Sequence, residues 1–244
     1  ADNALALRVD QYQALGAVAL TGADRVTLTD TRSAIESLDA ATFGLLAGKE
    51  IDAIDSTDNA LTLNLARYDA LGSVTLTGAD VVTLADTGSA LGARTAADIA
   101  ALAGKGIDAI DSTTDALSLS VAKFDALGAV TLTGADTVTL ADGKTELEGL
   151  GAAYIGALAG KGIDIIDSTA NALSLRVDQY QALGTVALTG DDDITLADAK
   201  EAIQALNATA IGQLAGKGID IIDSTSADNA LALRVDQYQA LGAV

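Results

Sequence analysis

Hydrophobic and polar residues alternate in short stretches of this chain. In the segments SVTLT (73–77) and VVTLAD (81–86), Val74, Leu76, Val82 and Leu84 fall on one face and the threonines on the other. This period of two predicts two short β-strands, each with one buried face. We predict two further strands in the segments IDAID (107–111) and ALSLS (116–120).

Between these strands the apolar spacing becomes helical. In TAADIAALAGKG (95–106), Ile99, Leu102 and Ala103 follow the i, i+3, i+4 pattern of a helix face. Thr95 and Asp98 form a capping-box pattern at its start, and the glycines of GKG suit a left-handed helix end. A second helix is predicted in NLARYDALG (64–72). The corresponding short helices end at Gly16, Gly72, Gly128 and Gly184.

The whole pattern repeats every 56 residues. The Leu-Gly step recurs at Leu15, Leu71, Leu127 and Leu183, and residues 227–244 are identical to residues 1–18. Each unit divides into two halves of about 28 residues, each a helix followed by two strands. One half leaves its apolar strand face open, so successive halves must stack to bury it. We therefore predict an α/β solenoid of about 28-residue helix-strand-strand coils, two per repeat.

We treat residues 1–244 as a single solenoid with repeats at approximately 1–50, 51–106, 107–162 and 163–218, and a partial repeat at 219–244. A rival interpretation folds VTLTGADVVTL (74–84) into a β-hairpin that turns at TGAD. Both interpretations need two strands and a tight corner. The strand pairing therefore stays open at this stage.

Composition limits the chemistry available to the chain. It contains no His, Cys, Met, Trp or Pro, which removes Cys/His zinc sites, thiol nucleophiles and Ser-His-Asp triads. Its formal charge is −20, so binding to nucleic acid or to an anionic membrane is disfavoured. An enzyme normally has one distinctive site, whereas this chain repeats every feature. We expect a protein without catalytic activity.

Aspartate is the polar residue that recurs most regularly. Two columns come from the IDxID segments, and a third holds Asp24, Asp80, Asp136 and Asp192. Stacked carboxylates could supply the oxygen ligands that calcium prefers, whereas Asp is also a common turn-capping residue. We expect no cofactor other than this calcium. The candidate calcium ligands are Asp52, Asp55, Asp108, Asp111, Asp164, Asp167, Asp220 and Asp223.

Two residues break the repeat and are candidates for a binding site. Arg94 stands in a column that otherwise holds leucine, and Tyr154 stands where other copies have Thr42, Asp98 and Ala210. A charged group in an apolar column is costly unless it reaches solvent or a partner. Each residue is either a binding hot spot or a tolerated substitution with an exposed side chain.

An aromatic column is expected to pack in the core rather than to hold a cofactor. It contains Tyr12, Tyr68, Phe124, Tyr180 and Tyr238. The GKG segments do not match a phosphate-binding loop, because that motif requires G-x-x-x-x-G-K-[ST] before a helix. Here the lysine follows a helix instead.

Two resemblances add to this picture. The pattern L-x-x-V-x-L-x-x-x-D-x-V from Leu71 onward resembles the leucine-rich repeat, with one extra residue before Asp80 and Asp in place of Asn. Segments such as VTLADTGSALGA and TAADIAALAGKGIDAIDST resemble tandem repeats of very large secreted or surface proteins of bacteria, some of which carry hemolysin-type calcium-binding segments elsewhere. The resemblance implies a leucine-rich-repeat-like fold, an extracellular or cell-surface location and a role in adhesion or biofilm. It brings no catalytic residues.

We therefore expect a rigid, acidic, non-catalytic spacer module from a large bacterial surface or secreted protein. The alternatives are a solenoid that binds a protein or a glycan, and a calcium-dependent folding module. The expected partners are the neighbouring repeats of the parent protein, with no nucleic acid and no membrane. Because the repeat pattern runs up to Val244, we also expect fraying or end-to-end self-association of this chain.

Overall fold

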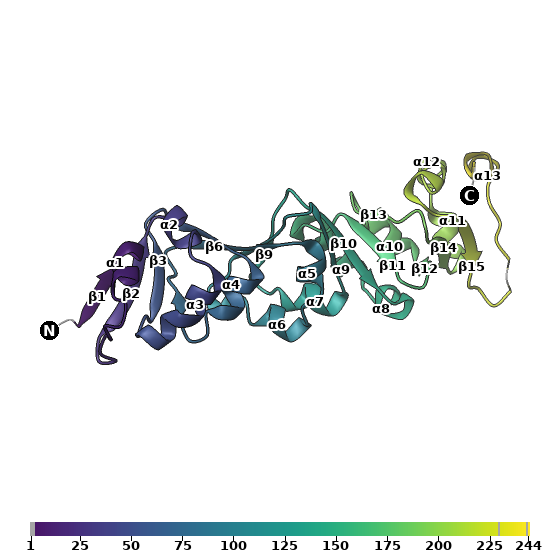
Figure 1. Cartoon of the computed structure of the whole chain (residues 1–244). Helices are drawn as coiled ribbons and strands as arrows, with labels where there is room; N and C mark the ends of the chain where they lie inside the picture. Colours follow the sequence, from purple (N-terminus) through teal and green to yellow (C-terminus); the bar gives the residue numbers. More distant parts are fainter. Residues whose placement is uncertain (1–2, 229, 243) are drawn as a thin grey trace. The chain divides into compact units, whose positions relative to one another are not determined.

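The protein is an α/β structure in which short strands alternate with short helices (Figure 1). The computed structural model describes residues 3–228, 230–242 and 244. It contains two compact units. The first comprises Ala1–Leu117 and Asp125–Asp136, and the second comprises Ser118–Phe124 and Thr137–Val244.

The first unit comprises the first two repeats and the beginning of the third. Its elements are β1 (Ala4–Leu7), α1 (Val9–Ala14), β2 (Arg25–Asp30), α2 (Arg32–Glu36), α3 (Ala40–Leu46), the 3-10 helix η1 (Ala47–Lys49), β3 (Ala53–Ser56), β4 (Ala60–Leu63), α4 (Leu65–Ala70), β5 (Thr75–Leu76), β6 (Val81–Asp86), α5 (Gly88–Gly92), α6 (Ala96–Ala100), η2 (Ala103–Lys105), β7 (Ala109–Ser112) and β9 (Thr131–Leu132).

The second unit repeats the same order of elements. They are β10 (Thr137–Asp142), α8 (Lys144–Glu148), α9 (Ala152–Leu158), η3 (Ala159–Lys161), β11 (Ile165–Ser168), β12 (Ala172–Leu175), α10 (Val177–Ala182), β13 (Ala187–Leu188), β14 (Asp193–Asp198), α11 (Lys200–Ala205), α12 (Ala208–Gly212), η4 (Ala215–Lys217), β15 (Ile221–Ser224) and α13 (Val235–Ala240). Strand β8 (Ala116–Leu119) and helix α7 (Val121–Ala126) straddle the boundary between the units.

The described strand pairs are all parallel. The first unit has two four-stranded sheets, in the orders β1-β2-β3-β5 and β4-β6-β7-β9. In the second unit β13, β11 and β10 are neighbours in one sheet, and β12, β14 and β15 form another. Parallel pairing requires a crossover between strands, and the helices supply it.

The hairpin at TGAD is absent from the first unit. Strand β5 pairs with β3, whereas β6 pairs with β4 and β7 in a different sheet. The turn between β5 and β6 therefore carries the chain from one sheet to the next. The strands here pair in parallel, so the hairpin interpretation of this segment is wrong.

Successive parallel steps are unequal in length. Leu61 in β4 lies opposite Val82 in β6, a step of 21 residues, and Leu84 in β6 lies opposite Ile110 in β7, a step of 26 residues. The expected coils of about 28 residues are longer than either step. The longer step holds two α-helices and a 3-10 turn, whereas the shorter one holds a single helix and a two-residue strand.

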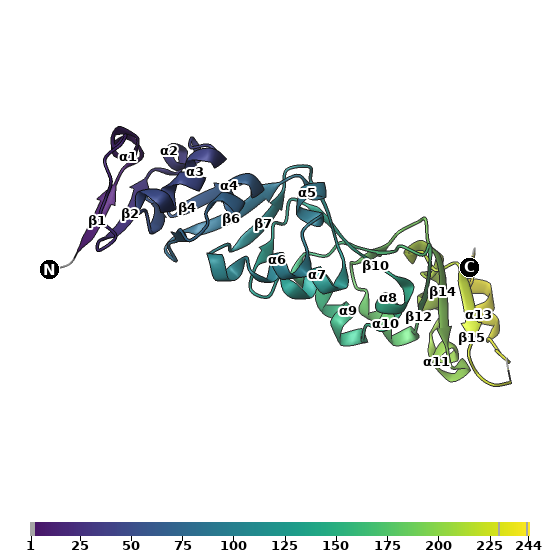
Figure 2. The same cartoon turned by 60° about the horizontal axis from the view of Figure 1, so that its bottom comes forward.

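The additional helices α2, α5, α8 and α11 are absent from the sequence expectation. Helix α5 begins at the cap Thr87, whose hydroxyl accepts the Ala90 N–H, but the glycines Gly88 and Gly92 within it hide its signal. Each such helix precedes a second helix, and three of these second helices, α3, α9 and α12, contact the next α-helix along the chain. Helices α3 and α4 lie side by side in both ribbon views (Figures 1 and 2), as do α9 and α10.

The predicted faces and helix ends are confirmed. Val74, Leu76, Val82 and Leu84 are at most 8% exposed, whereas Thr75 faces solvent. Thr95 and Asp98 form the capping box at the start of α6. Gly106 closes η2 in the left-handed conformation at φ +86°, a conformation that L side chains adopt only with strain. In the first repeat Glu50 occupies this position at φ 60°.

None of the helices in the described ranges combines the length and hydrophobicity needed to cross a bilayer.

Candidate functional site

The first aspartate of each IDxID segment bonds to the backbone of the preceding strand. Its carboxylate accepts the N–H of the residue opposite, at 2.7 Å for Asp52 with Val26 and 2.8 Å for Asp108 with Val82. In return, the Asp N–H donates to the carbonyl of the same residue, at 2.8 and 2.9 Å. Asp164 and Asp220 repeat the arrangement with Val138 and Ile194. These carboxylates extend the parallel ladder by one rung.

The second aspartate of the segment binds the following coil instead. Asp55 accepts the Thr77 hydroxyl at 2.8 Å, and Asp111 accepts the Thr133 hydroxyl at 2.6 Å. Asp167 does the same with Thr189 at 3.1 Å. The carboxylate of Asp223, the last of the column, has no hydrogen-bond partner in the part of the chain that the structure describes, although its backbone pairs with β14.

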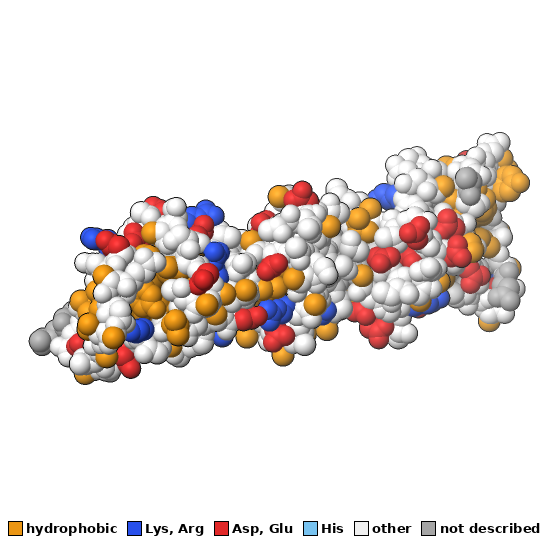
Figure 3. Space-filling view, viewed as in Figure 1, with side chains coloured by type: hydrophobic (Ala, Val, Ile, Leu, Met, Phe, Trp, Pro, Cys, Tyr) orange, Lys and Arg blue, Asp and Glu red, His pale blue; other side chains and the backbone are white. Residues whose placement is uncertain are grey.

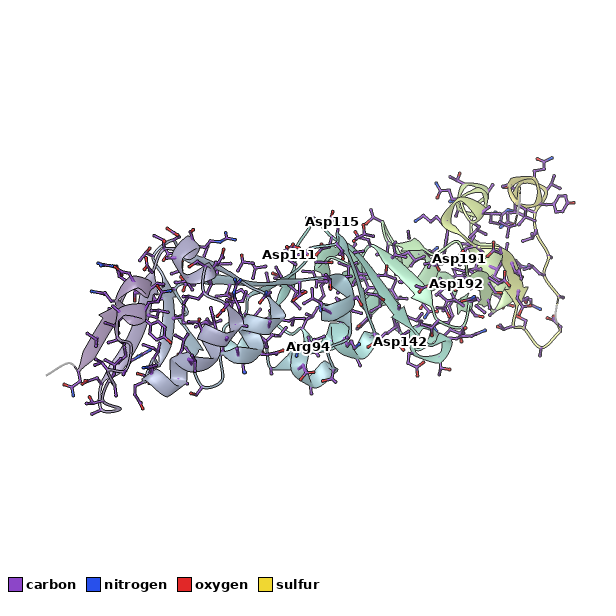
Figure 4. All side chains as sticks on the ribbon, in the orientation of Figure 1. Arg94, Asp111, Asp115, Asp142, Asp191 and Asp192 are labelled. Carbon is purple, nitrogen blue, oxygen red and sulfur yellow. The ribbon has the colours of Figure 1, made fainter. Side chains whose placement is uncertain are left out.

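Three members of the third aspartate column, Asp80, Asp136 and Asp192, are buried, whereas Asp24 is half-buried. Asp80 is 5% exposed, and its Oδ2 accepts the Ser56 N–H at 2.9 Å and the Thr77 hydroxyl at 3.0 Å. Asp136 and Asp192, the latter in the turn before β14 (Figure 4), repeat these contacts. Their Oδ1 atoms, and that of Asp80, are buried and without a hydrogen-bond partner among the described residues.

The eight candidate calcium ligands therefore divide into two sets that reach in opposite directions along the stack. The Asp52 column binds the strand before it, and the Asp55 column binds the threonine after it. Within the described residues, no three acidic side chains converge on a point that could hold a metal ion. The interpretation of these aspartates as caps of backbone and hydroxyl donors agrees with the geometry.

A fourth aspartate column escaped the sequence analysis. Asp30, at the end of β2, accepts the N–H of Val9 at the start of α1 at 2.9 Å. The same bond recurs in the later repeats, where the N–H groups of Leu65, Val121 and Val177 donate to the carboxylates of Asp86, Asp142 and Asp198. A carboxylate at a helix start is favourable because it meets unpaired amide N–H groups. Its signal was the invariant Asp at the end of each VTLAD-type strand.

The lysine of GKG lies over the aromatic column. The Lys105 ammonium is 5.2 Å from the Tyr68 ring centroid, and Lys161 and Lys217 are 5.5 and 5.9 Å from the rings of Phe124 and Tyr180. Lys217 also donates to the Gly184 carbonyl at 3.0 Å, beyond a helix C-terminus. Burial raises the pKa of the Tyr68 and Tyr180 hydroxyls. Tyr12, Tyr68, Phe124 and Tyr180 are buried, as expected, whereas Tyr238 is 70% exposed, so the core expectation is wrong for the last member of the column. The lysines cover the outer side of the three rings that they contact.

A column of side-chain donors joins the second, the fourth and the last partial repeat to the helix ends of the coil before them. The side-chain amide of Gln179 is fully buried and donates to the carbonyls of Leu150 at 2.7 Å and Glu148 at 3.1 Å. Arg67, its counterpart in the second repeat, donates to Leu38 and Glu36. Gln and Arg are interchangeable here because both present two N–H donors.

The two residues that break the repeat have partners within the chain. Arg94, between α5 and α6 (Figure 4), forms an ion pair with Asp69, and its side chain is 27% exposed. The hydrogen bond with Asp69 raises the pKa of Arg94. Tyr154, expected to be exposed, is half-buried, and its ring meets that of Phe124 edge to face at 6.2 Å.

Two open depressions lie on the surface of the first unit. One is lined by Arg32, Ser33, Glu36 and Ser37, and the other includes Asp24, Asp52 and Thr75. In the second, the Asp52 carboxylate is already bound to Val26. Neither depression contains Arg94 or Tyr154.

In comparisons with known proteins, no family model, no curated protein and no solved structure matches the chain.

Proposed function

We propose that the chain is a non-catalytic structural repeat module, a rigid acidic spacer of a large bacterial surface or secreted protein. The observation that carries the proposal is the recurrence of the same inter-coil bonds in successive repeats. Asp108, Asp164 and Asp220 each accept one backbone N–H from the strand before them at 2.8 Å. These aspartate side chains hold neighbouring coils together, which is what a rigid spacer requires.

The leucine-rich-repeat-like character belongs to the same proposal. Parallel strands, crossover helices and apolar strand positions agree with a solenoid of that general type. The location at the cell surface and the role in adhesion or biofilm rest on the resemblance of the repeats to those of bacterial surface proteins. The charge of −20 would keep neighbouring chains apart.

Binding of a protein or glycan receives less support from the geometry. Arg94 is engaged by Asp69, and Tyr154 contacts Phe124, so the two residues that differ from the repeat act within the chain. Calcium-dependent folding is the second candidate. It is favoured by the buried Oδ1 atoms of Asp80, Asp136 and Asp192, each of which lacks a hydrogen-bond partner among the described residues.

The test of the spacer proposal is the dependence of length on repeat number. A variant that lacks residues 107–162 removes one 56-residue repeat in register. We expect small-angle scattering to show a maximum dimension that falls by one constant step per repeat, with the circular dichroism per residue unchanged. A compact particle whose dimension does not follow the repeat number would overturn the proposal.

A further inference from the structure

Strand β15 ends its sheet at a position where its counterparts are paired on both sides. In the first unit β3 pairs with β2 and β5, and β7 pairs with β6 and β9, while in the second unit β11 pairs with β10 and β13. Among the described residues, β15 pairs with β14 alone. Ile222 is half-buried, whereas Ile54, Ile110 and Ile166 are at most 2% exposed.

The hydrogen-bonding groups along this edge match those that β11 uses. At β11 the carbonyl of Asp164 accepts the Ala187 N–H at 2.8 Å, and the carbonyl of Ile166 accepts the Thr189 N–H at 3.2 Å. The same positions in β15 are Asp220 and Ile222, and no described donor reaches these two carbonyls across the open edge. The Ser168 N–H of β11 donates to Asp192 at 2.8 Å, and its counterpart in β15 is the Ser224 N–H.

The first coil of the chain presents the complementary surface. Residues 19–24 (ALTGAD) correspond to Ala187–Asp192, and the Thr21 hydroxyl donates to Asp24 at 3.0 Å as Thr77 donates to Asp80. Val18 is 61% exposed, whereas its counterparts Val74, Val130 and Val186, each of which follows a preceding coil, are 5% exposed. In Figure 3, hydrophobic side chains gather over the β1–β2 region of the first unit.

We propose that β15 of one copy pairs with residues 19–24 of a second copy, in the parallel register of β11 with β13. Ile221 then lies opposite Ala19, and Ile222 lies opposite Leu20. The Thr21 hydroxyl reaches Asp223, and Asp24 receives the Ser224 N–H, as their counterparts do at β11. The interface is the internal coil-to-coil contact of the repeat, formed between two copies. In a longer polypeptide, a following repeat would occupy the same edge.

Because one segment occurs at both ends of the chain, this contact requires one copy of the segment to displace the other. Residues 227–244 of the first copy and residues 1–18 of the second are identical and would occupy one place. In the first copy Gln237 fastens α13 to the carbonyls of Gln204 and Leu206. In the second copy β1 pairs with β2. In the complex, one of the two identical segments stays and makes both the Gln237-type contacts and the β1–β2 pairing. The other segment detaches, and the total number of contacts is not reduced. Association is therefore slow, because a docked segment must first detach.

Repulsion between the negatively charged copies opposes the association, and salt weakens this repulsion. Each copy carries −20, and the carboxylates of Asp24 and Asp223 meet at the interface. Salt at about 0.15 M screens charges beyond roughly 8 Å. Added sodium chloride therefore strengthens the association, the opposite of its effect on contacts held by ion pairs. This inference does not depend on the spacer proposal.

The register is tested by crosslinking the full chain, which has no native cysteine. The variant Ala19→Cys with Ile221→Cys places two thiols on opposed positions of neighbouring strands, within the span of a disulfide. The matched control is Val81→Cys with Ile221→Cys, because Val81, like Ala19, is exposed, at 60%, but lies outside the interface. After prolonged incubation and oxidation, we expect a ladder of linked chains from the first variant and not from the control.

Sedimentation equilibrium supplies the second readout. We expect the mass of the unmodified chain to rise with concentration, and the association constant to fall at least about tenfold in a variant with Val18→Lys and Val244→Lys, since a lysine must then enter a buried valine position. The control carries Leu45→Lys and Val81→Lys at exposed sites outside the interface and should associate normally. A strict monomer at high concentration in added salt, or equal ladders from both cysteine variants, would overturn the proposal.

Discussion

Arg94 forms an ion pair with Asp69, and Arg94 stands where the other repeats have Leu. The Asp69 position holds Asp in the third repeat as well, at Asp125, and Gln in the others. The Asp69 side chain is 50% exposed, so the pair lies at the rim of the apolar column rather than inside it. Leu38 and Leu206, which stand in place of Arg94, are 3% exposed.

Replacing the odd arginine should therefore cost little. We expect Arg94→Leu to change the free energy of unfolding by less than about 1 kcal/mol, because an exposed pair contributes little and leucine fits the column. Urea denaturation of Arg94→Leu, Asp69→Asn and the double variant measures the coupling. A loss above about 2 kcal/mol in Arg94→Leu would show that Arg94 has a larger structural role than this pair.

The rung formed by Asp108 can be tested by a matched pair of substitutions. Asp108→Ala leaves the Val82 N–H without its acceptor at 2.8 Å, and we expect a loss of about 1 kcal/mol in the free energy of unfolding. Asp108→Asn keeps an oxygen acceptor and should lose less. Equal losses in the two variants, measured by urea denaturation, would mean that the negative charge matters and the hydrogen bond does not.

Calcium should leave the melting temperature unchanged if the aspartates act as caps. The described carboxylates of the Asp52 and Asp55 columns, apart from Asp223, already accept protein donors. Thermal melting by circular dichroism with EDTA and then with excess calcium gives the measurement. A large rise with calcium that disappears in Asp80→Asn would favour calcium-dependent folding, with the buried Oδ1 atoms as ligands.

Glu50 holds a backbone conformation that glycine adopts elsewhere. It has φ 60°, whereas Gly106, Gly162 and Gly218 occupy the equivalent position at 84–86°. We expect Glu50→Gly to raise the stability by up to about 1 kcal/mol, since the left-handed strain disappears. The reverse change, Gly106→Ala, should destabilise, because its Cβ would lie 3.1 Å from the Leu76 Cβ. Chemical denaturation of both variants decides the sign.

Acid should weaken the capping box of α6. Hydrogen bonds from the Thr95 hydroxyl and the Thr95 N–H lower the pKa of Asp98 in the folded protein. A lowered pKa favours folding above the unfolded value of about 3.9 and loses that contribution as the pH falls through the folded value. We expect the melting temperature to fall below about pH 4, less steeply in Asp98→Asn. An identical pH profile in the variant would contradict the assignment.

Local chemistry made part of the structure predictable. Thr95 and Asp98 lie three residues apart and cap a helix by contacts that need no other segment. Gly72 and Gly106 end helices because their backbone conformation is left-handed. The alternation through Val82 and Leu84 placed the buried strand face correctly. Each of these signals depends on neighbours within a few residues.

Contacts between coils were beyond local reasoning. Nothing near Asp52 or Asp55 shows that one carboxylate binds the strand before it and the other binds the threonine after it. Helix α5 was missed because its glycines weaken the helical signal, and its formation depends on support from the following coil, where Thr114 accepts the Gly88 N–H. The placement of Lys105 over Tyr68 joins residues from different coils.

The sequence by itself determined the repeat, the apolar columns, the helix ends and the acidic character, because each follows from residue type and short-range spacing. Only the tertiary structure decided that β5 and β6 belong to different sheets, that the parallel steps between paired strands are 21, 22 or 26 residues long, and from which donor each aspartate accepts a hydrogen bond. Those outcomes depend on the register between coils, which is fixed when the apolar columns pack and the backbone groups of neighbouring strands find their partners.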